Sequence, residues 1–209
     1  MLLRVYCIAI LFFFSLDTLA IGNFKPTEAQ LRLLPEYCKP RATGWGNDPK
    51  DPRTKRWFRI FGNDYTHMHH YCDGLKDINE GNRETDPVTR GRYFIHAIQE
   101  LSYVERNAGK GETKFKLMPE LYVKKGDAYV GMGDIPNAER YYHKSIREYP
   151  SYSRSYMMLI NLLMRLERFE DANEINELAL KQVKKTKFFK KKKKVIDNAL
   201  AEKAKIGKK

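Results

Sequence analysis

The chain has 209 residues, of which 42% are hydrophobic, so it can form one domain with appendages and bury a core. Its formal net charge of +13 is uneven, because residues 181–209 hold 13 lysines against only Asp197 and Glu202. This end of the chain therefore carries +11 and the rest only +2. The composition excludes a domain that is basic over its whole surface.

Residues 1–20 predict a signal peptide. Arg4 precedes an apolar run over 5–14, and Thr18 and Ala20 have the spacing of a signal-peptidase site. The run is shorter than the ~20 residues that span a bilayer. We therefore expect cleavage near Ala20 and a periplasmic or cell-envelope protein. An uncleaved N-terminal membrane anchor is the alternative.

The cysteines favour a disulfide. Loss of the signal peptide removes Cys7 and leaves Cys38 and Cys72. An even cysteine count in an exported chain favours pairing. The bridge would close a loop of about 35 residues and stabilise the fold by ~3 kcal/mol on the chain-entropy model.

Residues 21–84 predict an N-terminal region of helices and an aromatic loop. Apolar spacing predicts a short helix over 26–38, which Pro35 kinks or ends. Repeated turn signals over 39–63 predict an irregular loop. Four aromatic residues of this loop are expected packing anchors: Trp45, Trp57, Phe58 and Phe61. A helix over 64–79 should follow, capped by the Asn-Asp pair at its start.

The stretch 65-YTHMHHYC-72 lies in that expected helix. His67 and His70, one turn apart, could hold one zinc or copper ion if two further ligands, such as His96 or a cysteine, joined them. In the alternative interpretation, the helix packs its apolar face and the histidines only form hydrogen bonds. A disulfide at Cys72 would remove this thiol from ligation and from catalysis.

Residues 85–118 predict one long helix and a connector. Asp86 can cap a helix over 87–107, and Pro87 suits its first turn. Apolar residues recur in it at helical spacing. This helix is also a candidate member of a degenerate repeat, although it lacks signature residues.

Two units of equal length follow, over 119–152 and 153–186. A period of 34 residues with two helices per unit is typical of tetratricopeptide repeats. The first unit carries that signature: Tyr122, Gly126, Tyr129, Ala138, Tyr142 and Pro150. The second keeps part of it: Tyr156, Leu159, Leu163, Ala172 and Ala179. It departs from it with Ile160 for glycine, Asn176 for the second aromatic residue and Lys184 for proline.

The whole chain also resembles an exported bacterial type of tetratricopeptide protein. Members carry a Leu-Pro-x-Tyr-Cys element, here 34-LPEYC-38, and a histidine-rich helix, here 67–72, ahead of the repeats. The resemblance implies an all-α, helix-turn-helix solenoid with an N-terminal extension, and an exported location. It implies no particular chemistry.

The first helices of stacked repeats line a concave face. Here the expected face consists of Glu120, Val123, Asp127, Val130, Arg154, Met157, Asn161 and Met164. This mixed stripe suits a protein or peptide partner, since methionines make an adaptable surface. The alternative is that N-terminal helices cover the stripe as core, although burying Glu120 and Asp127 unpaired would be costly.

Residues 187–209 predict a lysine-rich capping helix or tail. Phe188 and Phe189 can cover the last repeat, which needs a solvating cap. Alternatively, a lysine run attracts an anionic lipid or polysaccharide surface: Lys190, Lys191, Lys192, Lys193 and Lys194. Nucleic acid would be attracted too, but export makes it a poor candidate.

No assembled catalytic motif is present in the sequence, neither a Ser-His-Asp order nor a glycine-rich phosphate loop nor a paired Cys-x-x-Cys motif. We therefore expect a non-catalytic, exported scaffold that binds a protein or peptide partner and needs no cofactor. A metal-binding envelope protein that uses His67 and His70 is the alternative.

Overall fold

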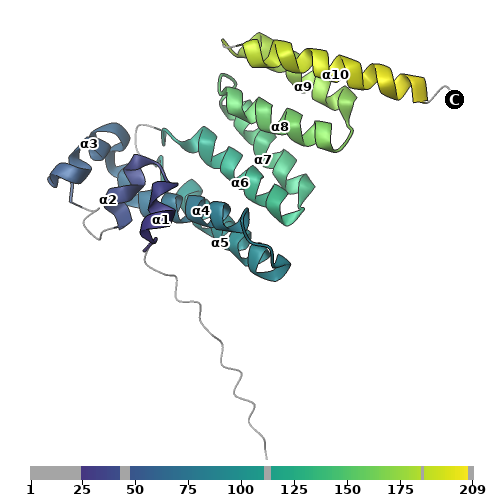
Figure 1. Cartoon of the computed structure of the whole chain (residues 1–209). Coiled ribbons are helices and arrows are strands. Elements are labelled where there is room, and N and C mark those ends of the chain that lie inside the picture. The colour runs from purple at the N-terminus through teal and green to yellow at the C-terminus, as the bar shows by residue number, and fades with distance from the viewer. Residues whose placement is uncertain (1–24, 43–47, 111–113, 185, 207–209) are drawn as a thin grey trace, which may run out of the picture.

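The computed structural model describes residues 25–42, 48–110, 114–184 and 186–206, and the regular structure in these ranges is helical (Figure 1). The expected signal peptide and the expected anchor Trp45 lie outside the described residues. Within those ranges, no helix combines the length and the apolar character needed to cross a bilayer.

Antiparallel helix pairs stack into an α-solenoid (Figure 1). The pairs are α4 (Met68–Gly81) with α5 (Pro87–Asn107), α6 (Met118–Met132) with α7 (Ile135–Glu148), and α8 (Ser153–Arg165) with α9 (Phe169–Gln182). A last helix, α10 (Lys187–Ile206), packs against α9. Along the stack, α4 contacts α6 and α6 contacts α8. The expected all-α, helix-turn-helix solenoid is confirmed, and α5 has the predicted bounds.

The α4–α5 pair is built like the α6–α7 pair. In α6, a Cβ added to Gly126 would lie 2.4 Å from the ring of Tyr142 in α7. In α4, a Cβ added to Gly74 would lie 2.9 Å from Cγ of Leu101 in α5. The missing side chain lets the two helices of each pair approach closely. The helix predicted over 87–107 is thus the second helix of a hairpin that begins with α4.

In the α8–α9 pair, the larger residue at the helix crossing is on the first helix and the smaller one is on the second. At the period of 34 residues, Ile160 stands in place of Gly126 and Asn176 in place of Tyr142. Both side chains are fully buried. A larger residue on the first helix is therefore matched by a smaller one on the second, which keeps the interface filled.

The N-terminal extension is more helical than its sequence predicts. It comprises α1 (Glu28–Arg32), the 3₁₀ turn η1 (Glu36–Cys38), α2 (Lys39–Ala42), α3 (Pro52–Phe61) and the 3₁₀ turn η2 (Gly62–His67). The irregular loop predicted over 39–63 is therefore wrong for α2 and α3. Asp51 caps α3 by accepting a hydrogen bond from the Arg53 backbone, and Pro52 occupies its first turn. The Asp-Pro pair starts a helix here and not a turn.

The helix predicted over 64–79 begins later, because α4 starts at Met68 after η2. Asp64 does not cap it: its carboxylate accepts a hydrogen bond from the backbone of Gly109, at 2.9 Å, in the connector after α5. This contact ties the start of the α4–α5 hairpin to its end.

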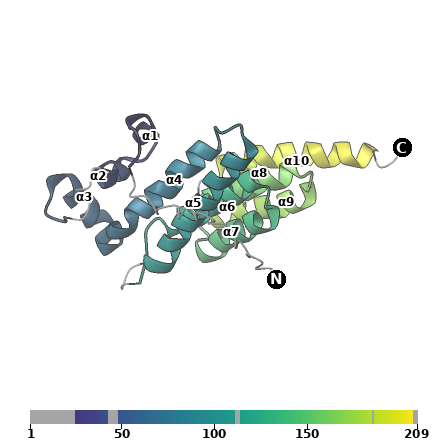
Figure 2. The same cartoon turned by 90° about the horizontal axis from the view of Figure 1, so that it is seen from below.

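Two hydrophobic cores support the solenoid. The first lies around α4, α5 and the start of α6, and Trp57, Phe58 and Phe61 pack against it as predicted. The second lies around α7, α8 and α9 and is covered by Phe189 and Ile196 of α10. Figure 2, which looks along the stack, shows α1, α2 and α3 to the left of the overlapping hairpins, with α10 extending to the right.

Candidate functional site

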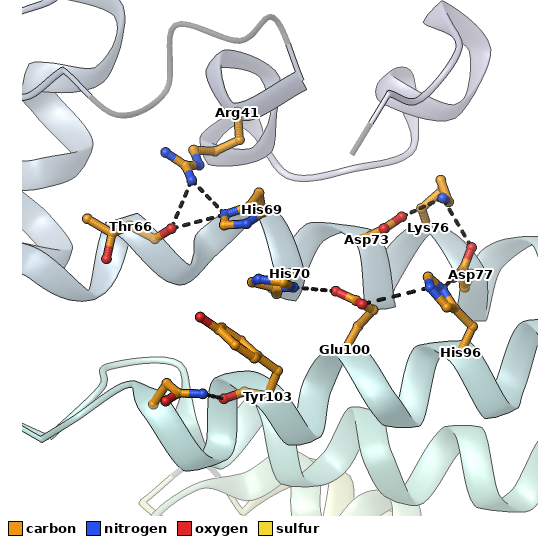
Figure 3. A network of polar contacts seen from close by, with 11 residues as sticks. Arg41, Thr66, His69, His70, Asp73, Lys76, Asp77, His96, Glu100 and Tyr103 are labelled. Atoms are coloured by element: carbon orange, nitrogen blue, oxygen red, sulfur yellow. Dashed lines mark hydrogen bonds and ion pairs between the residues drawn. The ribbon is translucent and has the colours of Figure 1, made fainter. Parts of the chain in front are cut away.

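A network of charged side chains fills one side of the α4–α5 interface (Figure 3). We call it the α4–α5 polar cluster; its members are His70, Asp73, Lys76 and Asp77 of α4 with His96 and Glu100 of α5. On α4 the members recur at three- and four-residue spacing, and on α5 they are four residues apart, so each set lies on one helix face. The two faces meet because Gly74 brings the helices close together.

Hydrogen bonds link the members across the two helices. His70 Nδ1 lies 2.6 Å from Glu100 Oε2, and His96 Nδ1 lies within hydrogen-bond distance of Asp77 Oδ2. The other ring nitrogen of His96, Nε2, lies 3.7 Å from Glu100 Oε1. Lys76 donates to Asp73 and lies 3.3 Å from Asp77 Oδ1. Every member of the cluster therefore touches another.

The cluster is buried and rich in negative charge. Asp73, Asp77 and Glu100 are all buried, whereas His96 is half-buried at the edge. Burial raises the pKa of the Asp73 carboxyl, and the hydrogen bond to Asp77 raises the pKa of His96. Within the cluster, three carboxylates share the ammonium group of Lys76 and the imidazoles of His70 and His96.

His67 and His70, the metal ligands predicted from the sequence, both lie beside one aromatic ring. The centroids of the His67 and Tyr103 rings are 5.8 Å apart, and those of His70 and Tyr103 are 3.8 Å apart. His69 instead accepts a hydrogen bond of 2.6 Å from Arg41. Burial lowers the pKa of His69 to about 4. His67 and His70 thus share Tyr103 as a neighbour, whereas His69 contacts Arg41. Among the described residues, the ligand atoms of these three histidines do not all lie within 4.8 Å of one another.

A different set of ligand atoms does converge. In the described part of the chain, those of Asp73, His96 and Glu100 all lie within 4.8 Å of one another. Sequence reasoning named His96 as a supplementary ligand but missed both carboxylates. The available signal was spacing: Asp73 and Asp77, and likewise His96 and Glu100, are one helical turn apart.

The predicted repeat face is mostly accessible, with one correction. Val123 is fully buried in the second core, so it supports α6 and cannot contact a partner. The other predicted residues are half-buried or, for Arg154, exposed: Glu120, Asp127, Val130, Arg154, Met157, Asn161 and Met164. We call these seven residues the repeat face. Val123 was misassigned because α6 is surrounded by four helices, α4, α5, α7 and α8.

The two carboxylates of the repeat face differ. Asp127 accepts a hydrogen bond of 2.8 Å from the hydroxyl of Tyr142, and burial raises its pKa. Glu120 forms no ion pair with any described residue, and its charge adds to burial in raising the pKa of Tyr152 to about 12. Glu120 is therefore the carboxylate available to a partner.

Helix α10 covers the last repeat and exposes part of its lysine run. Phe189 is buried against the last repeat, and Lys193 forms ion pairs with Glu177 at 3.3 Å and Asp197 at 2.9 Å. Lys192 lies over the ring of Phe188. A shallow cleft at the start of the helix is lined by Thr186, Lys187, Lys190, Lys191 and Lys194. The lysine run is thus divided into a packed side and an open side.

The sequence matches no model of a known protein family, and no curated protein is significantly similar to it.

Proposed function

We propose that this protein is a non-catalytic, exported tetratricopeptide scaffold that binds a protein or peptide segment at the repeat face. One observation carries the proposal: α6 and α8 lie side by side and leave polar groups accessible between apolar ones. The amide of Asn161 forms no hydrogen bond with any described residue, and Glu120 forms no ion pair. Polar groups without internal partners are available to an external one.

The chemistry of the face favours an extended segment with apolar and basic side chains. The amide of Asn161 can donate to and accept from a peptide backbone. Met157 and Met164 can adapt to apolar side chains of different shape. Glu120 can pair with a lysine or arginine of the partner.

A crosslinking experiment tests this proposal. A photo-crosslinking residue at position 161 should capture a discrete partner in intact cells, whereas the same residue at exposed position 174 on α9 should not. Met157→Glu with Asn161→Glu should abolish a crosslink formed from position 164. Equal capture from positions 161 and 174 would remove the repeat face from the proposal.

The open side of α10 supports a second role, which is attraction to an anionic lipid or polysaccharide surface. The cleft gathers four ammonium groups near the start of a 20-residue helix, where the helix dipole is also positive. Each lysine near an anionic bilayer contributes ~1 kcal/mol. Lys190→Glu with Lys194→Glu should therefore weaken binding to anionic vesicles at least about tenfold.

The matched control reverses two exposed lysines outside the cleft, Lys181 of α9 and Lys205 of α10. Neutral vesicles should bind neither variant nor the parent chain. Equal losses from both double variants would show that only net charge matters and that the cleft has no specific role.

A further inference from the structure

We propose that the α4–α5 polar cluster binds one divalent transition-metal ion through Asp73, His96 and Glu100. This site differs from the pair of His67 and His70 predicted from the sequence, and it is independent of the repeat face. The ligand atoms come from two facing helices and lie within 4.8 Å of one another. Zinc at ~2.0–2.2 Å from its ligands requires separations of about 3.4 Å, which small side-chain rotations can provide.

The hydrogen bonds around His96 favour ligation. Asp77 lies against Nδ1 and can accept its proton, so Nε2 is the nitrogen that would release its proton and bind an ion. Nε2 is the atom that faces Glu100, at 3.7 Å. A carboxylate behind a histidine that orients its other nitrogen is the usual support of a metal-bound imidazole. His70 supports Glu100 in the same manner, at 2.6 Å.

Charge also favours a cation. Once His96 gives up a proton to bind an ion, and with His70 neutral, three buried carboxylates and Lys76 leave a net charge of −2, which a divalent ion neutralises. Buried charge without compensation is costly, and binding of the ion removes that cost. His96 lies at the half-buried edge of the cluster and provides a route from solvent.

The ligand set indicates the class of ion. Imidazole suits zinc, iron, nickel and copper, whereas sites made only of oxygen ligands suit magnesium and calcium. A site with one imidazole and two carboxylates should therefore prefer zinc to magnesium or calcium. Lys76 would stay beside Asp77 as Asp73 turns toward the ion.

The first experiment is a zinc titration of the untagged chain, expressed with its signal sequence and stripped of metal by a chelator. We expect one zinc ion per chain and a higher melting temperature with zinc, and no such effect from equal magnesium. Cobalt in place of zinc should give visible absorption bands from a site with nitrogen and oxygen ligands. Absence of zinc binding at micromolar concentrations would overturn the proposal.

Variants locate the site. His96→Ala and Glu100→Gln should each weaken zinc binding at least about tenfold, the scale on which metal sites respond to lost partners. His143→Ala is the matched control, because His143 is exposed on α7, far along the chain from the cluster. Asp73→Asn keeps the size of the side chain and provides a second test if Glu100→Gln folds poorly.

A further variant tests the alternative metal site at His67 and His70. His67→Ala should leave zinc binding unchanged, since His67 contacts Tyr103 and no member of the proposed ligand set. If zinc binding survives His96→Ala and Glu100→Gln but is lost in His67→Ala, the ion belongs to the histidine-rich stretch. That result would overturn the assignment to Asp73, His96 and Glu100.

Discussion

The first and last helix pairs of the solenoid have the same architecture and different interiors. The α4–α5 pair buries Asp73, Asp77 and Glu100 beside its apolar core. The α8–α9 pair buries no carboxylate among its described residues, and its polar buried side chains are Ser155 and Asn176. A helix hairpin thus tolerates either interior if the two helices match in volume where they cross.

The ends of the stack also receive support of different kinds. The α4–α5 pair is joined to the N-terminal extension by a covalent bond between Cys38 and Cys72, whose Cα atoms are 5.6 Å apart. The α8–α9 pair is covered by Phe189 and Ile196 of α10. The first hairpin therefore has a crosslink in addition to aromatic packing, whereas the last is covered by apolar packing.

Removal of the crosslink should give the largest effect and separate the two ends. Cys38→Ala with Cys72→Ala should lower the free energy of unfolding by about 3–4 kcal/mol, because the bond closes a loop between residues 34 positions apart. Urea unfolding followed by circular dichroism measures the change. In a Trp45→Phe background, the remaining tryptophan is Trp57, which packs on the first core, so its fluorescence reports on that end.

Reduction provides the control for this variant. A reductant should lower the urea midpoint of the parent chain and leave that of the double variant unchanged. A loss below about 1 kcal/mol would mean that packing, and not the crosslink, holds the N-terminal extension on α4.

The junction between the first pair and the rest should be the next most sensitive point. Glu105 of α5 accepts hydrogen bonds of 2.6 Å from Lys125 of α6 and from Lys144 of α7. Lys125 is buried, so Glu105→Gln would leave its charge without a full partner. We expect a loss of about 2–3 kcal/mol in urea unfolding. Glu139→Gln, at a more exposed pair with Arg168, should cost less than about 1 kcal/mol.

The same bridge predicts a dependence on pH. Burial raises the pKa of Glu105, but the hydrogen bonds from Lys125 and Lys144 outweigh burial, and the pKa falls below its ordinary value of 4.5. The bridge therefore stabilises the fold fully above pH 4.5, and this stability is lost as the pH falls through the lowered pKa. Glu105→Gln should flatten this part of the stability profile, and an unchanged profile would contradict the assignment.

Glycine substitutions test whether the two pairs depend equally on close approach. Gly126→Ala should lower the free energy of unfolding by about 1–3 kcal/mol, because its Cβ would meet the rigid ring of Tyr142. Gly74→Ala should cost less, since the flexible side chain of Leu101 can turn away. Gly91→Ala, where a Cβ meets nothing within 4 Å, should stabilise by about 1 kcal/mol. Equal losses at all three positions would show that volume matching does not decide the packing.

The sequence predicts the solenoid well because period and packing residues are local signals. The period of 34 residues and the pair of Gly126 and Tyr142 indicate two hairpins directly. The α4–α5 hairpin lacks this signal for two reasons. Leu101 stands at its helix crossing in place of an aromatic residue, and Leu101 is farther along the chain from Gly74 than Tyr142 is from Gly126. The helix α3 was not predicted because its cap Asp51 and its first residue Pro52 also suit a turn.

The polar cluster was not predicted from the sequence, because it depends on contact between helices. His70 and Glu100 are 30 residues apart, and nothing in the sequence places them side by side. The histidine-rich stretch 65–72 attracted attention by composition, whereas the ligand atoms that converge belong to residues spread over two helices. Local spacing finds the members of such a cluster, and only the tertiary structure shows that they meet.

The smallest expected effect concerns the α8–α9 pair. Asn176 is fully buried, and both polar atoms of its amide lack a hydrogen-bond partner among the described residues. Asn176→Leu keeps a similar shape and removes this unsatisfied amide, so we expect a gain of about 1 kcal/mol in urea unfolding. Asn198→Leu, on the exposed side of α10, is the matched control and should change stability by less than about 0.5 kcal/mol. A loss of stability in Asn176→Leu would mean that Ile160 leaves no room for the larger residue. The α8–α9 pair would then be limited by volume and not by polarity.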